Sequence, residues 1–190
     1  VNPTLNNTGP FRLWIYEALL DNRPIDQMVT QLIMMEGSKY FGGPAGFELA
    51  TQNDAPMAAK AHVLTQAFLG VQMKCARCHD APFHESTQQD LFEIAAMLKR
   101  GPQVVPSTSS VPLEGIDPDD LAVTISVKPG TNIQSHWPLT DITVERLPKE
   151  LIRFPDDSRA QLARLITQPL NQRFSQVVVN RLWKKLIGYG

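Results

Sequence analysis

Cysteine is scarce in this sequence of 190 residues, which contains only two cysteines. Both lie in one short run, Cys75-Ala76-Arg77-Cys78-His79. Two cysteines so close together exclude a disulfide-rich fold and a four-cysteine metal cluster, since no thiol is left over elsewhere. Any chemistry that needs a thiol therefore belongs to this run.

Long apolar runs are also lacking. No stretch approaches the roughly 18 apolar residues that a membrane-spanning helix needs, and the start of the chain shows no signal-peptide pattern. The chain begins at Val1 rather than Met, so we expect a processed protein or a fragment of a longer one. The sequence predicts no transmembrane segment and leaves the compartment open on these grounds.

The composition as a whole has no large excess of charge of either sign. The chain has 18 Lys and Arg against 19 Asp and Glu, with a net charge of −1 and a pI near 6.5. Such a balance argues against a basic field that would attract nucleic acid or an anionic membrane surface. We expect no nucleic-acid partner.

The run from Cys75 to His79 has the pattern Cys-x-x-Cys-His, which is typical of covalent attachment of a c-type haem. Two thiols three positions apart on one helical turn can reach both vinyl groups of a porphyrin, and the imidazole that follows can ligate the iron. The sequence thus predicts one haem c, with Cys75, Cys78 and His79 as its binding residues and His79 as an iron ligand.

Two other readings of the same run are weaker. His79 and His84 could complete a zinc site with the two cysteines, but structural zinc pairs usually come from two segments well apart in sequence. A dithiol redox site expects a strand before the motif and a helix after it. Here a predicted helix leads into the motif instead.

The second iron ligand decides between electron transfer and ligand chemistry. We predict His136, which lies on a segment long enough to fold across the far side of the haem. Met97 is the next candidate, although core packing explains it equally well. His84 is too close in sequence to His79, and His62 would lie about 25 Å away along an unbroken helix. An open or water-filled position is a further alternative.

The predicted fold is mainly α, a haem-binding domain of about six helices with a small β element near residues 121–145. Apolar residues at helical spacing favour helices at Phe11–Leu20, from Pro24 toward Gly37, from Pro56 onward, from a Ser86-to-Gln89 capping box to Arg100, from Asp157 or Ser158 to before Pro169, and at Gln172–Ile187. We divide the chain into a helical haem-binding domain (1–102), a connection of loop and short strand (103–157) and a C-terminal helical segment (158–190).

The helix from Pro56 carries a regular apolar stripe of Met57, Ala61, Leu64, Phe68 and Val71. A further step of four residues from Val71 reaches Cys75, and a step of three from there reaches Cys78. If Gly70 does not break the helix, both sulfurs face the core. Separately, the alternation of residues 121–127 predicts a half-buried strand, with Ile142 and Val144 as a short partner strand.

The segment from Phe68 to Asp80, followed by Pro82-Phe83, resembles the cytochrome-motif domain of large planctomycete proteins of unknown function. Arg12 to Gln31 resembles the upstream part of that domain, and Arg159 to Gly190 resembles the companion domain that follows it. We therefore expect residues 158–190 either to begin that companion domain or to pack on the first domain. The segment 103–157 is poorly matched. The chain also departs from the family at Ala81, where relatives often have a second histidine, with His84 nearby instead.

The resemblance implies an exported bacterial protein, periplasmic or extracellular, that is usually part of a longer polypeptide and carries one haem. It implies no settled activity. We predict a monohaem c-type cytochrome that transfers electrons between redox protein partners or within an assembly, reaching the membrane only through a partner or a further segment. The alternatives are the haem domain of a larger redox enzyme and a structural subunit stapled by haem. No catalytic constellation is evident, which favours electron transfer over catalysis.

Overall fold

The computed structural model of the chain describes residues 9–37, 43–49, 51, 53–111, 117, 121–141 and 154–190. Most of the described chain is helical, with one small antiparallel sheet, and the predicted mainly α fold is confirmed. The elements in chain order are α1 (Gly9–Leu20), α2 (Ile25–Met34), η1 (Pro44–Leu49), α3 (Pro56–Leu64), η2 (Thr65–Leu69), η3 (Cys75–Arg77), α4 (Gln88–Lys99), β1 (Gln103–Val104), β2 (Asn132–Ile133), α5 (Ser158–Thr167) and α6 (Gln172–Ile187).

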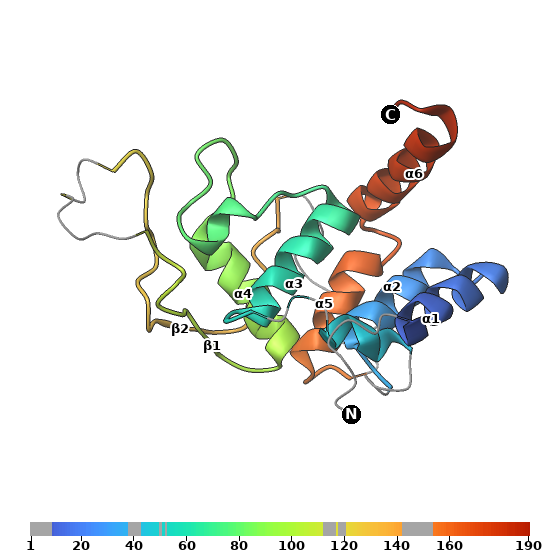
Figure 1. The fold of residues 1–190 in the computed structure, drawn as a ribbon, viewed down its shortest axis with the longest axis horizontal. Helices are drawn as coiled ribbons and strands as arrows, with labels where there is room; N and C mark the ends of the chain where they lie inside the picture. The colour runs from blue at the N-terminus through green and yellow to red at the C-terminus, as the bar shows by residue number, and fades with distance from the viewer. Residues whose placement is uncertain are drawn as a thin grey trace.

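The core lies between α2, α3, α4 and α5 (Figure 1). Helix α4 packs against both α3 and α5, and α5 in turn packs against α2. The residues that are almost fully buried there come from all four helices, and they include Ile33, Leu64, Leu91, Phe92, Ile94, Leu98, Leu162 and Ile166. Burial of this many large apolar side chains is the main stabilising contribution, at roughly 1.5–3 kcal/mol for each.

Helix α4 begins with a capping box one residue later than the sequence predicts. The side chain of Thr87 accepts a hydrogen bond from the backbone N–H of Asp90, and the Asp90 carboxylate accepts one from Thr87 N–H. The predicted pair was Ser86 with Gln89. The capping box usually has glutamate or glutamine at the third helical position. Here Asp90 takes that position, and its shorter side chain makes the same hydrogen bond.

Two polar side chains set the joints of the C-terminal helices. Asp157, one of the two residues from which the sequence predicts this helix to begin, caps α5 by accepting from the backbone N–H groups of Arg159 and Ala160. Asn171 caps α6 by accepting from Phe174 N–H, while its amide group donates to the last carbonyls of α5 at Leu165 and Ile166. The buried Asn171 therefore ties the end of one helix to the start of the next.

The sheet differs in position from the predicted strand. Gln103 pairs with Ile133 and Val104 with Asn132, so only β2 falls within the predicted β region. Residues 121–127 form no strand. The Thr124 carbonyl accepts from Asp80 N–H and Val127 N–H donates to the Gln88 side chain, so the backbone bonds to these residues instead of to a second strand. The predicted partner strand at Ile142 and Val144 lies outside the described residues.

Candidate functional site

The helix that leads toward the two cysteines ends before it reaches them. Helix α3 continues as the π-helix η2, and this ends at Gly70, whose φ of +67° places it in the left-handed region. The N–H of Gly70 still bonds to the Thr65 carbonyl, which closes the wide π turn. Because glycine adopts a positive φ without the Cβ penalty, Gly70 is where the chain leaves the helix axis.

The motif then makes a short turn of its own. The N–H groups of Cys78 and His79 both reach the Cys75 carbonyl, at 3.0 and 3.2 Å. Ala76 is fully buried against the core, whereas Cys75 is exposed and Cys78 is partly buried. The prediction that both sulfurs face the core required a helix unbroken at Gly70, and this condition is not met.

Both thiols are free, and one of them meets a loop from further along the chain. The sulfur of Cys78 lies 3.8 Å from the Thr108 carbonyl oxygen, and Cys75 faces solvent. Thiols that are unpaired and accessible remain open to covalent attachment. On the outer side of the turn, Arg77 forms an ion pair with Asp54.

His79 is held in one tautomer. Its Nδ1 lies 2.8 Å from the backbone oxygen of Asp80, and since a carbonyl oxygen only accepts, Nδ1 must donate. The lone pair of the neutral ring is then on Nε2. An Nδ1–H bonded to a backbone carbonyl is the usual way in which proteins orient a histidine that ligates a metal through Nε2.

Asp80 fixes the loop that follows the motif. Its carboxylate accepts from Gln88 N–H at 2.8 Å and from the Ser126 hydroxyl at 2.6 Å, and its own N–H donates to the Thr124 carbonyl at 2.8 Å. Residues far apart in sequence are thereby drawn to the residue directly after His79. Sequence reasoning missed this role, because nothing in the spacing of Ser126 or Gln88 relates either residue to Asp80.

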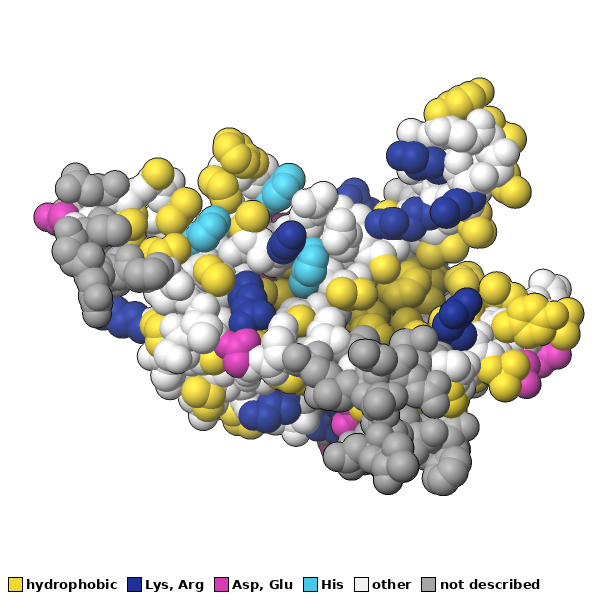
Figure 2. All heavy atoms as spheres, viewed as in Figure 1, with side chains coloured by type: hydrophobic (Ala, Val, Ile, Leu, Met, Phe, Trp, Pro, Cys, Tyr) yellow, Lys and Arg dark blue, Asp and Glu magenta, His cyan; other side chains and the backbone are white. Residues whose placement is uncertain are grey.

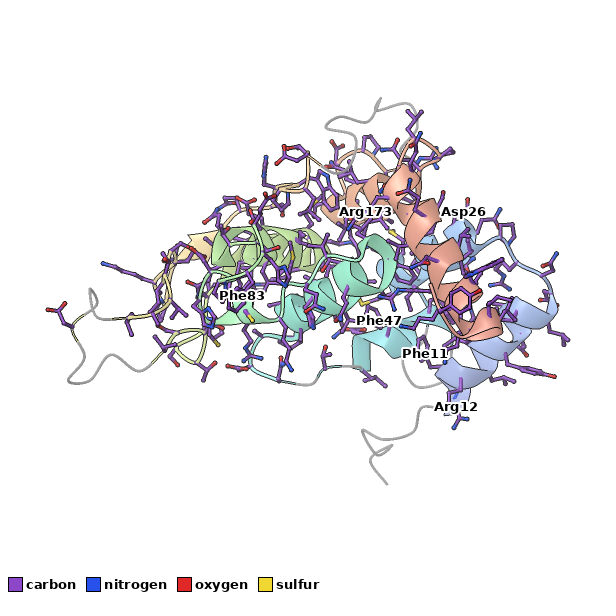
Figure 3. The ribbon with its side chains drawn as sticks, turned by 90° about the horizontal axis from the view of Figure 1, so that it is seen from above. Phe11, Arg12, Asp26, Phe47, Phe83 and Arg173 are labelled. Carbon is purple, nitrogen blue, oxygen red and sulfur yellow. The ribbon has the colours of Figure 1, made fainter. Side chains whose placement is uncertain are left out.

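The loop from Asp80 to Ser86 closes on itself and presents an aromatic side chain to solvent. Ala81 N–H bonds to the Ser86 carbonyl at 3.0 Å, while Phe83 is 90% exposed and His84 is exposed. Figure 3 shows Phe83 on this loop beside α4, at the opposite side of the molecule from Phe11 of α1. An exposed phenylalanine in the loop that follows the motif supplies apolar surface that a planar ligand could cover.

The predicted distal ligand, His136, lies exposed after β2 with its Nδ1 3.0 Å from a Glu93 carboxylate oxygen. Glu93 belongs to α4, the same helix against which the motif turn η3 packs. Helix α4 is thus the common neighbour of the motif and of His136. Met97 is buried in the core on α4, as its alternative reading expects.

His62 is nearer to the motif than an unbroken helix allows. Burial lowers its pKa, and the Lys74 ammonium lowers that pKa further. The expected separation of about 25 Å assumed an unbroken helix, and the helix ends at Gly70 instead, so that figure does not apply. The Nδ1 of His62 is buried and has no hydrogen-bond partner among the described residues.

The arrangement of Cys75, Cys78 and His79 fits a haem c. Two free thiols and an imidazole whose Nδ1 donates to a backbone carbonyl leave from one turn, and the loop that follows them exposes Phe83. In the described part of the chain, no three His, Cys, Asp or Glu side chains gather closely enough to hold a metal ion. A haem needs no such cluster, because the porphyrin supplies four of the iron ligands.

A second unusual group, Lys60, lies apart from the motif. The side chain is fully buried, donates to the Thr51 hydroxyl at 3.2 Å and lies 6.0 Å from the centre of the Phe47 ring. Burial lowers the pKa of Lys60 to about 8, partly opposed by Glu48 and assisted by Arg159. Sequence reasoning passed over Lys60, since it sits next to the apolar stripe of α3 and not in any motif.

The described helices include none that is both long and apolar enough to cross a bilayer. No curated protein matches the chain, and no solved structure matches it. One family model does match, over residues 1–102, and its description reads PSCyt2, protein of unknown function (DUF1549). These residues are more than half of the chain and include the motif turn, α4 and every element before them, so the protein belongs to the PSCyt2 family of proteins of unknown function (DUF1549).

Proposed function

We propose that the chain binds one haem c covalently through Cys75 and Cys78, with His79 as an iron ligand, and serves as a monohaem electron-transfer module. The observation that carries the proposal is the hydrogen bond from His79 Nδ1 to the Asp80 carbonyl. His79 directly follows Cys78 in the sequence, and the thiols of Cys75 and Cys78 are both free. When bound, the haem supplies an iron that can take up and release one electron.

The residues around the motif have supporting roles in this proposal. The Asp80 carbonyl accepts from Nδ1–H, which holds the His79 ring in orientation and leaves Nε2 as the nitrogen that can face the iron. The Asp80 carboxylate holds the loop through Gln88 and Ser126, so the histidine is positioned by a braced segment. Bracing of this kind limits movement around a cofactor when its charge changes.

The setting of the module forms part of the same proposal. Resemblance favours an exported bacterial protein, periplasmic or extracellular, in which residues 158–190 begin the companion domain and redox proteins are the partners. A larger redox enzyme that contains this haem domain, and a subunit in which haem mainly stabilises the fold, are the competing functions. They differ in whether the iron takes an external ligand and whether its oxidation state responds to partners.

The first test is maturation of the chain in a host that exports proteins and attaches haem c. We expect a haem that stays with the protein on denaturation and shows c-type bands, with Cys75→Ser and Cys78→Ser each weakening the attachment. His84→Ala is the matched control, because His84 is an exposed histidine of the same loop that needs no role in binding. Absence of haem bands in the exported wild-type protein would overturn the proposal.

The second test separates electron transfer from ligand chemistry. We expect the reduced spectrum to stay unchanged when carbon monoxide is added, as for iron with two strong protein ligands. With His136 as the distal ligand, His136→Ala should turn a low-spin spectrum into a high-spin one. A wild-type spectrum that shifts with carbon monoxide would favour the enzyme instead.

A further inference from the structure

The two thiols of the motif have unequal surroundings. Cys75 is exposed, whereas Cys78 is partly buried and its thiol donates to the Thr108 carbonyl across 3.8 Å. Thr108 belongs to a turn in which Ser109 N–H donates to the Pro106 carbonyl at 2.9 Å. One thiol therefore faces solvent, and the other meets a turn that lies 30 positions further along the chain.

This turn, residues 106–109, follows β1 and lies outside the residues that match the family model. Figure 1 shows the chain after β1 running beside α4 toward the loop that precedes this helix. The start of the turn is fixed on the small sheet, since Val105 N–H donates to the Thr131 carbonyl at 2.9 Å and the Val105 carbonyl accepts from Gly130 N–H at 2.8 Å. The turn is thus anchored at the sheet and reaches Cys78 from there.

Gln88, the first residue of α4, joins the turn to the loop after the motif. Its side chain is fully buried, with the amide group donating to the Ser109 carbonyl at 3.3 Å and the oxygen accepting from Val127 N–H at 3.2 Å. The backbone N–H of Gln88 donates to the carboxylate of Asp80. A buried glutamine that is bonded at both ends of its amide keeps these segments in one arrangement.

The turn is held by few bonds and is able to open. Ser107 and Thr108 are exposed, and the bond from Gln88 to the Ser109 carbonyl is long at 3.3 Å. The Ser109 hydroxyl is buried and has no hydrogen-bond partner among the described residues. A buried hydroxyl without a partner is unfavourable, and it regains hydrogen bonds to water when the turn lifts. Opening therefore breaks the bonds from Gln88 and Cys78 but relieves Ser109.

We propose that the turn of residues 106–109 sets the order of haem attachment, with Cys75 bonded first and Cys78 second. The proposal rests on the proposed function, since it concerns how the same haem becomes attached. Each thiol adds to a vinyl group of the porphyrin, so that a carbon–sulfur bond forms and the vinyl double bond becomes a single bond. The thiol proton passes to the outer vinyl carbon, and no oxidant or reductant is consumed.

The surroundings of the two sulfurs determine this order. Cys75 reacts as it stands, whereas Cys78 reacts only when the Thr108 carbonyl has moved off its sulfur. Figure 2 shows histidine side chains gathered over α3 and over the loop before α4, the two segments between which the motif lies in the chain. Once a haem is tethered at Cys75 on this face, the second addition is intramolecular, and the opening of the turn decides its rate.

The test measures alkylation by iodoacetamide in the full 190-residue chain before haem is attached, with both thiols reduced. Trypsin cuts after Arg77, so Cys75 and Cys78 fall in separate peptides and mass spectrometry gives one rate for each. We expect Cys75 to react about five times faster or more, because the reactivity of a thiol follows its exposure.

Gln88→Met removes both amide bonds and keeps an unbranched side chain in the core. It should raise the rate at Cys78 about threefold or more and leave the rate at Cys75 unchanged, whereas a general loss of stability would raise both rates. Gln89→Met is the matched control, because Gln89 is exposed on the same helix and bonds to Glu93, and both rates should stay as in the wild type.

Pro106→Gly keeps the test decisive if Gln88→Met does not fold. It frees the backbone of the turn without changing α4, and it should likewise raise the rate at Cys78 alone. Equal rates at Cys75 and Cys78 in the wild type would overturn the proposed order. An equal rise at Cys78 in Gln88→Met and Gln89→Met would also overturn it.

Maturation in a host that attaches haem c gives the second readout. Cys78→Ser should retain more covalently bound haem than Cys75→Ser, because the first bond still forms without any movement of the turn. The reverse ranking would overturn the proposed order while leaving haem binding intact. Failure of the proposed function is a different result, in which the exported wild type carries no haem although its cysteines alkylate at the expected rates.

Discussion

Helices α4 and α6 have similar apolar stripes in sequence and opposite surroundings in space. In α4, Leu91, Ile94 and Leu98 are almost fully buried between α3, α5 and the small sheet. In α6, Leu182 and Leu186 carry on the same kind of spacing but are exposed. A periodic stripe therefore identifies the apolar side of a helix, whereas neighbouring elements decide whether that side is covered.

The largest effect that separates the two helices should come from Leu98→Ala in α4. Leu98 is fully buried, so the truncation removes apolar contacts and leaves a cavity. We expect a loss of about 2–5 kcal/mol in the free energy of unfolding, measured by urea denaturation. A loss below about 1 kcal/mol would mean that α4 is less enclosed than described.

The buried core also contains an ionisable group, Lys60 of α3. Its lowered pKa makes the stability of the fold depend on pH. Because the folded pKa is about 8, below the usual value of 10.5, the unfolded chain holds more protons between these two values. The free energy of unfolding should therefore rise with pH over this window, by up to about 1.4 kcal/mol per pH unit from this group. Below about pH 8 the contribution is flat and unfavourable to folding.

The comparison variant is Lys60→Met, which keeps much of the side-chain volume and removes the titrating group. Urea denaturation near pH 8 and about pH 9.5 should show a smaller rise in stability for the variant than for the wild type. Parallel pH profiles for the two proteins would show that Lys60 titrates near its ordinary value.

Gly70 lies at the contact between the enclosed region and α6. A Cβ at this position would have a strained positive φ and would lie 3.3 Å from a methyl group of Val177. We expect Gly70→Ala to cost about 1–2 kcal/mol and to raise amide hydrogen exchange in α6. Gly101→Ala is the control, since a Cβ there meets nothing within 4 Å. Equal effects of the two substitutions would contradict the role assigned to Gly70.

The smallest effect should come from Leu186→Ala in α6. The side chain is 81% exposed, so its truncation removes few contacts and should change the free energy of unfolding by less than about 0.5 kcal/mol. The same substitution type thus gives several-fold different results at Leu98 and Leu186. If Leu98→Ala and Leu186→Ala lowered the free energy of unfolding by similar amounts, Leu186 would be packed against another surface in solution.

Most of the helices were predictable from sequence, because local signals determine them. The stripes of α1, α2, α4, α5 and α6 all lie in the predicted segments, and of the two predicted starts of α5, Asp157 and Ser158, it is Asp157 that caps the helix. The strand predicted at residues 121–127 is wrong, since its backbone finds partners at Asp80 and Gln88. Alternation of apolar residues carries no information about which distant groups will accept or donate hydrogen bonds.

That Cys75, Cys78 and His79 lie on one turn was predictable from sequence, whereas the orientation of that turn was not. The short spacing of Cys75, Cys78 and His79 keeps them on one turn whatever the surroundings. The direction of that turn depends on the backbone conformation of Gly70, and glycine adopts positive and negative φ about equally. The bracing of Asp80 by Ser126 joins residues 46 positions apart, which spacing alone does not indicate.

The π-helix η2 makes the chain before the motif sensitive to its length. Its wide turn holds one residue more than an α-helical turn would, and the Gly70 N–H reaches back five residues to Thr65. Deleting one residue between Thr65 and Leu69 would restore ordinary helical bonding and rotate the following chain by about 100° about the helix axis. Gly70 would then no longer face Val177 of α6, and the cysteines would leave from another side. Substitutions in this turn can be absorbed by repacking, but a change in residue number alters the direction of the whole motif.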